Sequence, residues 1–157
     1  MDHDERFLAR ALELALKGSE MNEGGPFGAV LVRAGKIIGE GWNRVVASND
    51  PTAHAEIGAI RMACAALNRF HLPETTLYAS SEPCPMCLSA AYWARIERIV
   101  FANSRAEAAA IGFCDDELYC ELNRHSSARR IVMEHHPMPD ALLPLRHWAN
   151  NPARTPY

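Results

Sequence analysis

Two cysteines, Cys84 and Cys87, stand three residues apart in the stretch EPCPMCL, and a proline precedes each of them. On a helix, residues at positions i and i+3 share a face, so both thiols can point at one spot. In the first turn, backbone N–H groups and the helix dipole stabilise thiolates, and Pro85 suits that turn because its missing N–H would have no helical partner. The sequence therefore predicts two thiolates at a helix start, suited to a metal ion or to redox chemistry.

A third potential ligand, His54, stands thirty residues upstream in the segment AHAEIGAIRMA, two residues before Glu56. One histidine and two cysteines would leave one position of a tetrahedral Zn²⁺ open to water, which is the arrangement of catalytic zinc sites. Zinc lowers the pKa of bound water toward ~7, and a carboxylate beside that water can move its protons. We therefore expect one zinc ion held by His54, Cys84 and Cys87, with Glu56 as the proton carrier.

Two other interpretations of the cysteine pair remain open from the residues alone. A closed structural zinc site would need a fourth ligand, which Cys64, Cys114 or Cys120 could supply, and the protein would then be a non-catalytic interaction module. A thioredoxin-like redox pair would need no histidine. Both leave the coincidence of H-x-E with P-C-x-x-C unexplained, and neither gives Glu56 a role.

The composition is that of an ordinary globular protein, with 157 residues, 48% hydrophobic residues, 22% charged residues and a net charge of −3. This length predicts a single domain over residues 1–157. The negative net charge argues against a large nucleic-acid partner. The sequence has neither a run of the ~20 apolar residues that a membrane span needs nor a signal peptide at its acidic beginning, so we expect a reducing cytoplasm.

Hydrophobic periodicity and turn residues predict alternating helices and strands, and hence an α/β fold. We expect a three-layer α/β/α sandwich with helices on both faces of a central mixed sheet of about five strands, and the sheet should open with an antiparallel hairpin. The expected elements are a helix that Gly18 ends, a hairpin that turns at Ala34-Gly35, a helix over 53–67, a strand over 75–80, a helix over 84–95 and a strand over 98–102. In the tail, RIVMEH is expected to be extended, and Pro144 to interrupt a short helix.

The combination of H-x-E with P-C-x-x-C is the signature of the zinc deaminases. The chain resembles the cytidine-deaminase-like superfamily and, within it, the short bacterial guanine deaminases. The resemblance extends over GGPFGAV, SNDPTAHAE, EPCPMCL, YWAR and a GF followed by two acids, and it covers nearly the whole chain. It implies the cytidine deaminase-like fold and the hydrolysis of guanine to xanthine and ammonia.

The resemblance also implies the residues of a substrate pocket. Asn43 is similar to a purine-binding asparagine, and Asp115 to an acid that contacts the amino side of the base. The other substrate contacts implied are Phe27, Ala55, Trp93, Phe113 and Tyr157. Cys114 stands where the family has an acid, which leaves open whether Asp115 or a neighbour takes the acid's part.

Several substrates fit this pattern. Guanosine would make the same purine contacts and needs only room for a ribose, and aminotriazines carry an amino group beside a ring nitrogen. The tRNA adenosine deaminases share the zinc motif, but RNA phosphates favour clustered basic residues, for which Arg124, Arg129 and Arg130 are the candidates.

The tail is expected to take part in assembly. The resemblance suggests a homodimer in which the C-terminal segment, from about 130 to 157, is exchanged between subunits, a known route to symmetric dimers. Tyr157 would then close over bound base.

Overall fold

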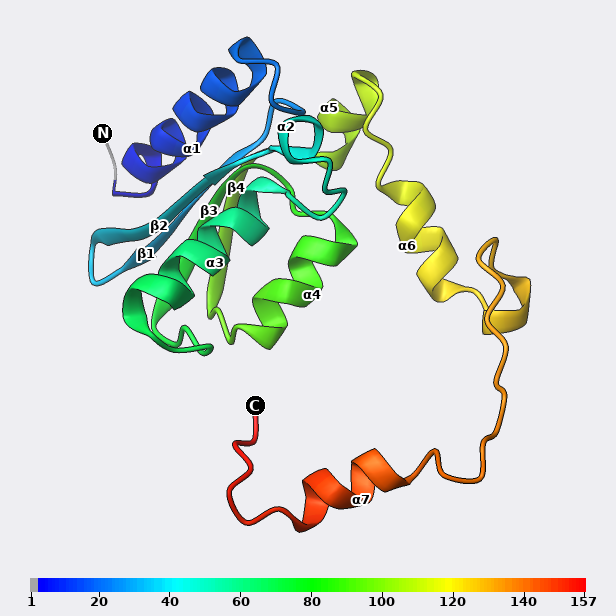
Figure 1. Ribbon diagram of the computed structural model, residues 1–157. Coiled ribbons are helices and arrows are strands. Elements are labelled where there is room, and N and C mark those ends of the chain that lie inside the picture. The colour runs from blue at the N-terminus through cyan, green and yellow to red at the C-terminus, as the bar shows by residue number, and fades with distance from the viewer. Residues whose placement is uncertain (1–2) are drawn as a thin grey trace. The chain divides into compact units, whose positions relative to one another are not determined.

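A mixed sheet of four strands, in the order β2-β1-β3-β4, forms the centre of the fold within residues 3–157, which the computed structural model describes (Figure 1). β1 pairs antiparallel with both β2 and β3, and β3 pairs parallel with β4. The strands are β1 (Gly28–Arg33), β2 (Lys36–Trp42), β3 (Thr75–Ser81) and β4 (Arg98–Asn103). The predicted hairpin turn is confirmed: Ala34 and Gly35 join β1 to β2 with positive φ values of 47° and 72°.

Helices cover both faces of this sheet, as predicted (Figure 1). α1 (His3–Glu20) packs on one face, where its buried Phe7 and Leu14 meet Val30, Val32 and Tyr78. α3 (Ala55–Leu67) and α4 (Pro85–Trp93) lie on the other face, which presents Ala29, Leu31 and Leu77. Because successive strand residues point to opposite faces, β1 serves both layers, and its first five residues are all buried.

Glycines let the helices approach the sheet closely. A Cβ at Gly41 would lie 2.2 Å from the carbonyl oxygen of Ala55, so β2 and the first turn of α3 are in direct backbone contact. Gly18 does not end its helix, contrary to expectation. It lies inside α1, where a Cβ would lie 2.6 Å from the Trp42 ring, so its small size serves packing.

The remaining helices are short. α2 (Val45–Ser48) was not predicted, α5 (Arg105–Ala110) begins with a capping box formed by Ser104 and Glu107, and α6 spans Asp116–Asn123. The chain divides into two compact units, the first ending at Asp116 and the second running over Glu117–Tyr157. Within residues 3–157, no helix has the length and apolar character needed to cross a membrane.

The second unit differs from the expectation in two places. The segment RIVMEH does not join a sheet, so the described chain has four strands instead of about five. No apolar alternation anchors it, because Ile131, Val132 and Met133 are all exposed. Pro144 stands in the first turn of α7 (Leu143–Asn150), where a missing N–H costs nothing, instead of interrupting that helix.

Candidate active site

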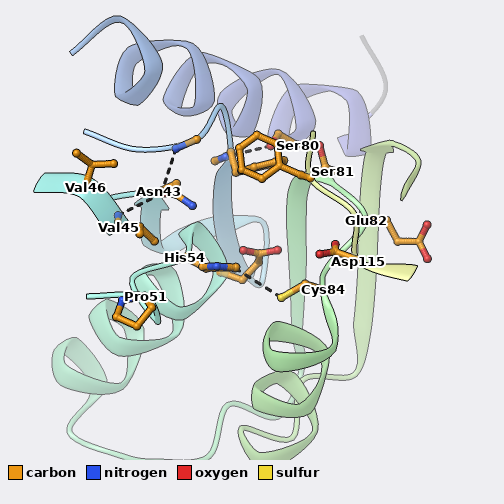
Figure 2. Close-up of a pocket in the computed structure, with 15 residues that line it drawn as sticks. Asn43, Val45, Val46, Pro51, His54, Ser80, Ser81, Glu82, Cys84 and Asp115 are labelled. Carbon is orange, nitrogen blue, oxygen red and sulfur yellow. Dashed lines mark hydrogen bonds between the residues drawn. The ribbon is translucent and has the colours of Figure 1, made fainter. Parts of the chain in front are cut away.

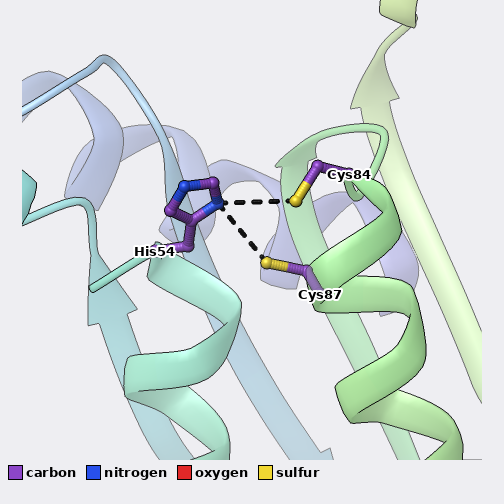
Figure 3. Close-up of side chains that lie close together, drawn as sticks. All are labelled: His54, Cys84 and Cys87. Atoms are coloured by element: carbon purple, nitrogen blue, oxygen red, sulfur yellow. Dashed lines mark hydrogen bonds between the residues drawn. The ribbon is translucent and has the colours of Figure 1, made fainter. Parts of the chain in front are cut away.

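The three predicted metal ligands meet at the beginnings of two helices (Figure 3). His54 is the N-cap residue of α3, Cys84 is the N-cap residue of α4, and Cys87 lies in the first turn of α4. Neither N-cap side chain makes a capping hydrogen bond, and both lie instead in the cluster with Cys87 (Figure 3). The Nδ1 atom of His54 lies 3.6 Å from the sulfur of Cys84 and 3.5 Å from that of Cys87.

These distances fit a tetrahedral zinc ion. With Zn–N of about 2.05 Å and Zn–S of about 2.3 Å, tetrahedral angles place N and S roughly 3.6 Å apart. Among the residues that the structure describes, no other histidine, cysteine or carboxylate joins these three ligands as a fourth. Cys114 and Cys120 are exposed. The donor set therefore leaves the fourth zinc position to a small ligand, and the closed structural site has no support.

The two thiols differ in acidity. Their mutual hydrogen bond, together with His54, lowers the pKa of Cys84 to about 4. The same hydrogen bond, together with burial, raises the pKa of Cys87, and the interaction with Cys84 raises the pKa of His54. A thiolate at neutral pH is thus held at Cys84, which prepares the cluster for a cation.

Glu56 lies in the first turn of α3, two residues after His54, and is only 8% exposed. Burial raises its pKa above the usual range for a glutamate. A carboxyl group with a raised pKa binds a proton more readily than a free glutamate, and it can return that proton, which is the requirement for general acid–base catalysis.

A pocket of about 330 Å³ opens beside this cluster (Figure 2). It is lined by Gly25, Phe27, Gly28, Asn43, Val45, Val46, Pro51, His54, Glu56, Ser80, Ser81, Glu82, Cys84, Phe113 and Asp115. Its volume lies at the lower end of the range for small-molecule sites, which suits a small planar ligand.

Asn43 is 4% exposed and is fixed in orientation by the chain around it. Its Oδ1 atom accepts hydrogen bonds from the backbone N–H groups of Gly25 (3.2 Å) and Val45 (3.1 Å). Its Nδ2 atom has no hydrogen-bond partner within residues 3–157, so a donor of known orientation faces the pocket. A Cβ at Gly24 would lie 2.0 Å from Oδ1, which explains why a glycine precedes Gly25.

Two aromatic rings form an apolar wall. Phe27 and Phe113 meet edge to face, with their centroids 4.8 Å apart and their planes at 87°. A Cβ at Gly25 would lie 2.9 Å from both rings, so the second glycine of GGPF lets them approach. Aromatic faces of this kind suit a flat heterocycle.

Asp115 is the acid that reaches the pocket from the segment after α5 (Figure 2). Burial raises its pKa, and the negative charge at Cys84 acts in the same direction. Cys114 is exposed, and Asp116 begins α6. Of the three neighbouring residues, the structure therefore brings Asp115 to the site.

The family model for the cytidine and deoxycytidylate deaminase zinc-binding region matches residues 1–103, which include all three ligands and Glu56. The chain belongs to this family. It is a zinc-dependent deaminase, and His54, Cys84 and Cys87 form a group that could hold the metal.

The chain is also similar to individual proteins of the deaminase family. The chain is 47% identical to a guanine deaminase of Bacillus subtilis over 150 residues, which are 96% of each chain. An X-ray structure of guanine deaminase from that organism superposes with a TM-score of 0.96 at 45% identity and covers 100% of this chain and 99% of that one. A tRNA-specific adenosine deaminase of Haemophilus influenzae is 46% identical over 120 residues, 73% of this chain and 69% of the relative.

Three of the predicted substrate contacts are not among the residues that line this pocket. Ala55, the first residue of α3, is fully buried in the core, and Trp93 ends α4 with 68% of its surface exposed. Tyr157 belongs to the second unit and is 72% exposed. Their roles stay predictions, as do those of Phe27, Asn43, Phe113 and Asp115.

Sequence reasoning missed part of the lining. Pro51 and Glu82 stand beside the ligand motifs in the chain, and this adjacency could have identified them. Val45 and Val46 could not have been found in this way, because α2, which carries them, has no hydrophobic periodicity in its four residues.

Proposed function

We propose that this deaminase hydrolyses guanine to xanthine and ammonia with one zinc ion per chain. The observation that carries the proposal is the convergence of an oriented amide donor, Asn43, with two carboxyl groups of raised pKa, Glu56 and Asp115, in an aromatic pocket beside the zinc ligands. The similarity to the Bacillus subtilis guanine deaminase supports it. So does a solved structure of a protein in complex with 2,6-diaminopurine, with 35% identity and a TM-score of 0.67, which covers 71% of this chain and 62% of that one.

Asn43 and the aromatic wall orient the base. Nδ2 of Asn43 donates to an acceptor atom of the purine ring, while the rings of Phe27 and Phe113 exclude water from its apolar surface. Asp115 accepts from the exocyclic amine at C2. Because Oδ1 of Asn43 is already held by two backbone N–H groups, its donor is fixed before the base arrives, which lowers the entropic cost of binding.

Glu56 moves the protons of the reaction. When bound, zinc lowers the pKa of a water molecule and so supplies the nucleophile that adds to C2. Glu56 accepts the proton that this nucleophile loses and delivers it to ring nitrogen N3. It then accepts the proton of the new hydroxyl group on C2 and delivers it to the departing amine. The C2–N bond breaks, ammonia leaves, and xanthine remains.

The test is ammonia release by the zinc-loaded protein across guanine, guanosine, adenine, cytosine, cytidine, an amino-triazine and an adenosine-containing RNA stem-loop. We expect guanine to give the highest kcat/KM. A preference for guanosine would reassign the substrate, and deamination of the RNA with no turnover of guanine would overturn the proposal.

We also propose that each chain forms one zinc deaminase domain and that the protein works as a homodimer. In this dimer the C-terminal segment, about 130–157, is exchanged between the two subunits. Residues 117–157 bury none of their side chains, and Ile131, Val132, Leu145 and Trp148 are exposed, so this segment has no core of its own. Such a segment needs a further surface to become stable. Light scattering should give the mass of a dimer, and a monomer at working concentration would refute the exchange.

The proposed location is the cytoplasm. Cys84 and Cys87 must stay reduced to act as ligands, and a reducing compartment keeps them so. Fractionation of the producing cells, with the protein followed by antibody, would test the location.

A further inference from the structure

The segment between α5 and α6 carries two residues that line the pocket, Phe113 and Asp115. Gly112, with a φ of +101°, ends α5: its N–H donates to the carbonyl oxygen of Ala109 at 3.0 Å, and the N–H of Phe113 donates to the carbonyl oxygen of Ala108 at 3.1 Å. These bonds fix the backbone as far as Phe113. Asp115 lies two residues further on, so its position depends on contacts beyond this helix end.

Arg105 connects the far end of this segment to the wall of the pocket. Its Nε atom lies 3.1 Å from Oε1 of Glu82, and a terminal guanidinium nitrogen lies 3.3 Å from Oδ1 of Asp116, the residue directly after Asp115. The backbone N–H of Arg105 also donates to Oε2 of Glu82 at 3.3 Å. One planar guanidinium group thus contacts two carboxylates, a geometry for which arginine is suited and lysine is not.

Glu82 gives this bridge a fixed anchor on the zinc side of the pocket. It follows β3, and its backbone N–H donates to the carbonyl oxygen of Asn103 at 2.8 Å, which ties it to the end of β4. Only Pro83 separates it from the ligand Cys84, and Glu82 is one of the residues that line the pocket with Asp115 (Figure 2). A displacement of Asp116 relative to Glu82 would therefore be a displacement of Asp115 relative to the metal ligands.

We propose that Arg105 is a positioning residue, which holds Asp115 in place by bridging Glu82 and Asp116. The inference rests on the proposed function, since that function assigns Asp115 to the base. Contacts that form equally in the bound substrate and in the transition state change KM more than kcat. Loss of the bridge should therefore weaken substrate binding more than it slows the chemical step.

The test compares zinc-loaded Arg105→Gln with the parent and with Arg33→Gln. The control removes an arginine whose ion pair with Glu74, at 2.6 Å, lies at the other end of β1 from the pocket-lining Gly28. We expect Arg105→Gln to raise KM for guanine about two- to fivefold, the range for partly exposed ion pairs, and to change kcat less than KM. Amide hydrogen exchange at residues 111–116 should rise in Arg105→Gln alone.

A double-mutant cycle separates a positioning role from a general loss of charge. If Arg105 acts through the bridge, Asp116→Asn raises KM in the same direction, and the double variant resembles Arg105→Gln alone. A double variant whose effect is the product of the single effects overturns the proposal, as do unchanged exchange at 111–116 and unchanged KM in Arg105→Gln. If the parent does not act on guanine at all, the proposed function fails, while the exchange measurement still decides whether Arg105 holds the segment.

Discussion

Replacing Gly41 by alanine tests how closely the sheet controls the zinc ligands. The added Cβ would lie 2.2 Å from the carbonyl oxygen of Ala55 and 2.7 Å from the backbone nitrogen of Ala59. Both atoms belong to the backbone of α3, so no side-chain rotation relieves the overlap. Ordinary contact requires a separation of about 3.4 Å, so the first turn of α3 must move away from β2 by roughly 1 Å.

This movement acts directly on the metal site, because His54 immediately precedes α3. The present Nδ1–sulfur distances of 3.5 and 3.6 Å fit tetrahedral zinc, and metal–ligand distances are typically held within about 0.2 Å. A displacement of roughly 1 Å should reduce zinc affinity by at least about tenfold, in the range for disturbed supporting residues. Overpacking of this kind also costs about 1–3 kcal/mol of folding free energy, or roughly 2–12 °C in Tm for a chain of this size.

The assay is zinc competition with a chromophoric chelator, together with thermal unfolding in the presence and absence of zinc. Gly58→Ala is the matched control on α3 itself, where the new Cβ would lie 3.5 Å from the Cα of Gly41, an ordinary contact. Since alanine is the better helix former, the control should keep its zinc and gain up to about 1 kcal/mol. Parental zinc affinity in Gly41→Ala would refute the argument that β2 sets the position of His54.

Two further substitutions and one deletion have expected outcomes. Glu56→Gln should keep one zinc per chain by metal analysis and lose roughly 10²–10⁴-fold in kcat, because an amide cannot carry the proton; zinc loss would contradict its assigned role. Asp4→Asn should lower Tm at pH 7, because Arg98 and then Tyr78 hold the pKa of Asp4 below its usual range. The Asp4 carboxylate stabilises the fold above its unfolded pKa of about 3.9, so the Tm difference from the parent should shrink as pH falls below that value; a difference independent of pH would exclude this origin. Deletion of residues 153–157 should lower kcat/KM sharply and leave zinc content and Tm unchanged, and undiminished activity would show that the tail does not serve the site.

The layers of the fold follow from patterns that are local in the sequence. Phe7, Ala11 and Leu14 recur at helical spacing, and β1 is a short run of apolar residues ended by a turn at Ala34-Gly35. Each signal extends over a few residues, so it can be detected before the fold is known. The prediction that Gly18 ends its helix was wrong, because two kinds of glycine look alike in the sequence. One ends a helix, and the other lies inside a helix and makes room for an aromatic ring from a strand.

The metal site could also be predicted from local sequence patterns, whereas the substrate pocket could not. Ligand type and spacing predict a metal site at His54, Cys84 and Cys87, because few residue types bind zinc and helix geometry brings the last two together, and the structure places the three side chains in one cluster. The pocket wall depends instead on approaches between distant segments, such as Phe27 with Phe113. No periodicity encodes such an approach, and only the family resemblance pointed to it.

Placing ligands at helix N-caps has a cost in stability that can be measured. His54 and Cys84 occupy N-cap positions without accepting a hydrogen bond from their helices, whereas Ser104 caps α5 with its hydroxyl. A serine at an N-cap typically contributes about 1 kcal/mol, and the backbone at His54, with φ −74° and ψ 158°, already has the extended conformation that a capping serine adopts. His54→Ser should therefore abolish zinc binding and yet raise the Tm of the zinc-free protein above that of the zinc-free parent, while Ser104→Ala lowers it. A zinc-free His54→Ser variant less stable than the zinc-free parent would mean that the imidazole contributes more through its contacts with the two thiols than a capping hydrogen bond would.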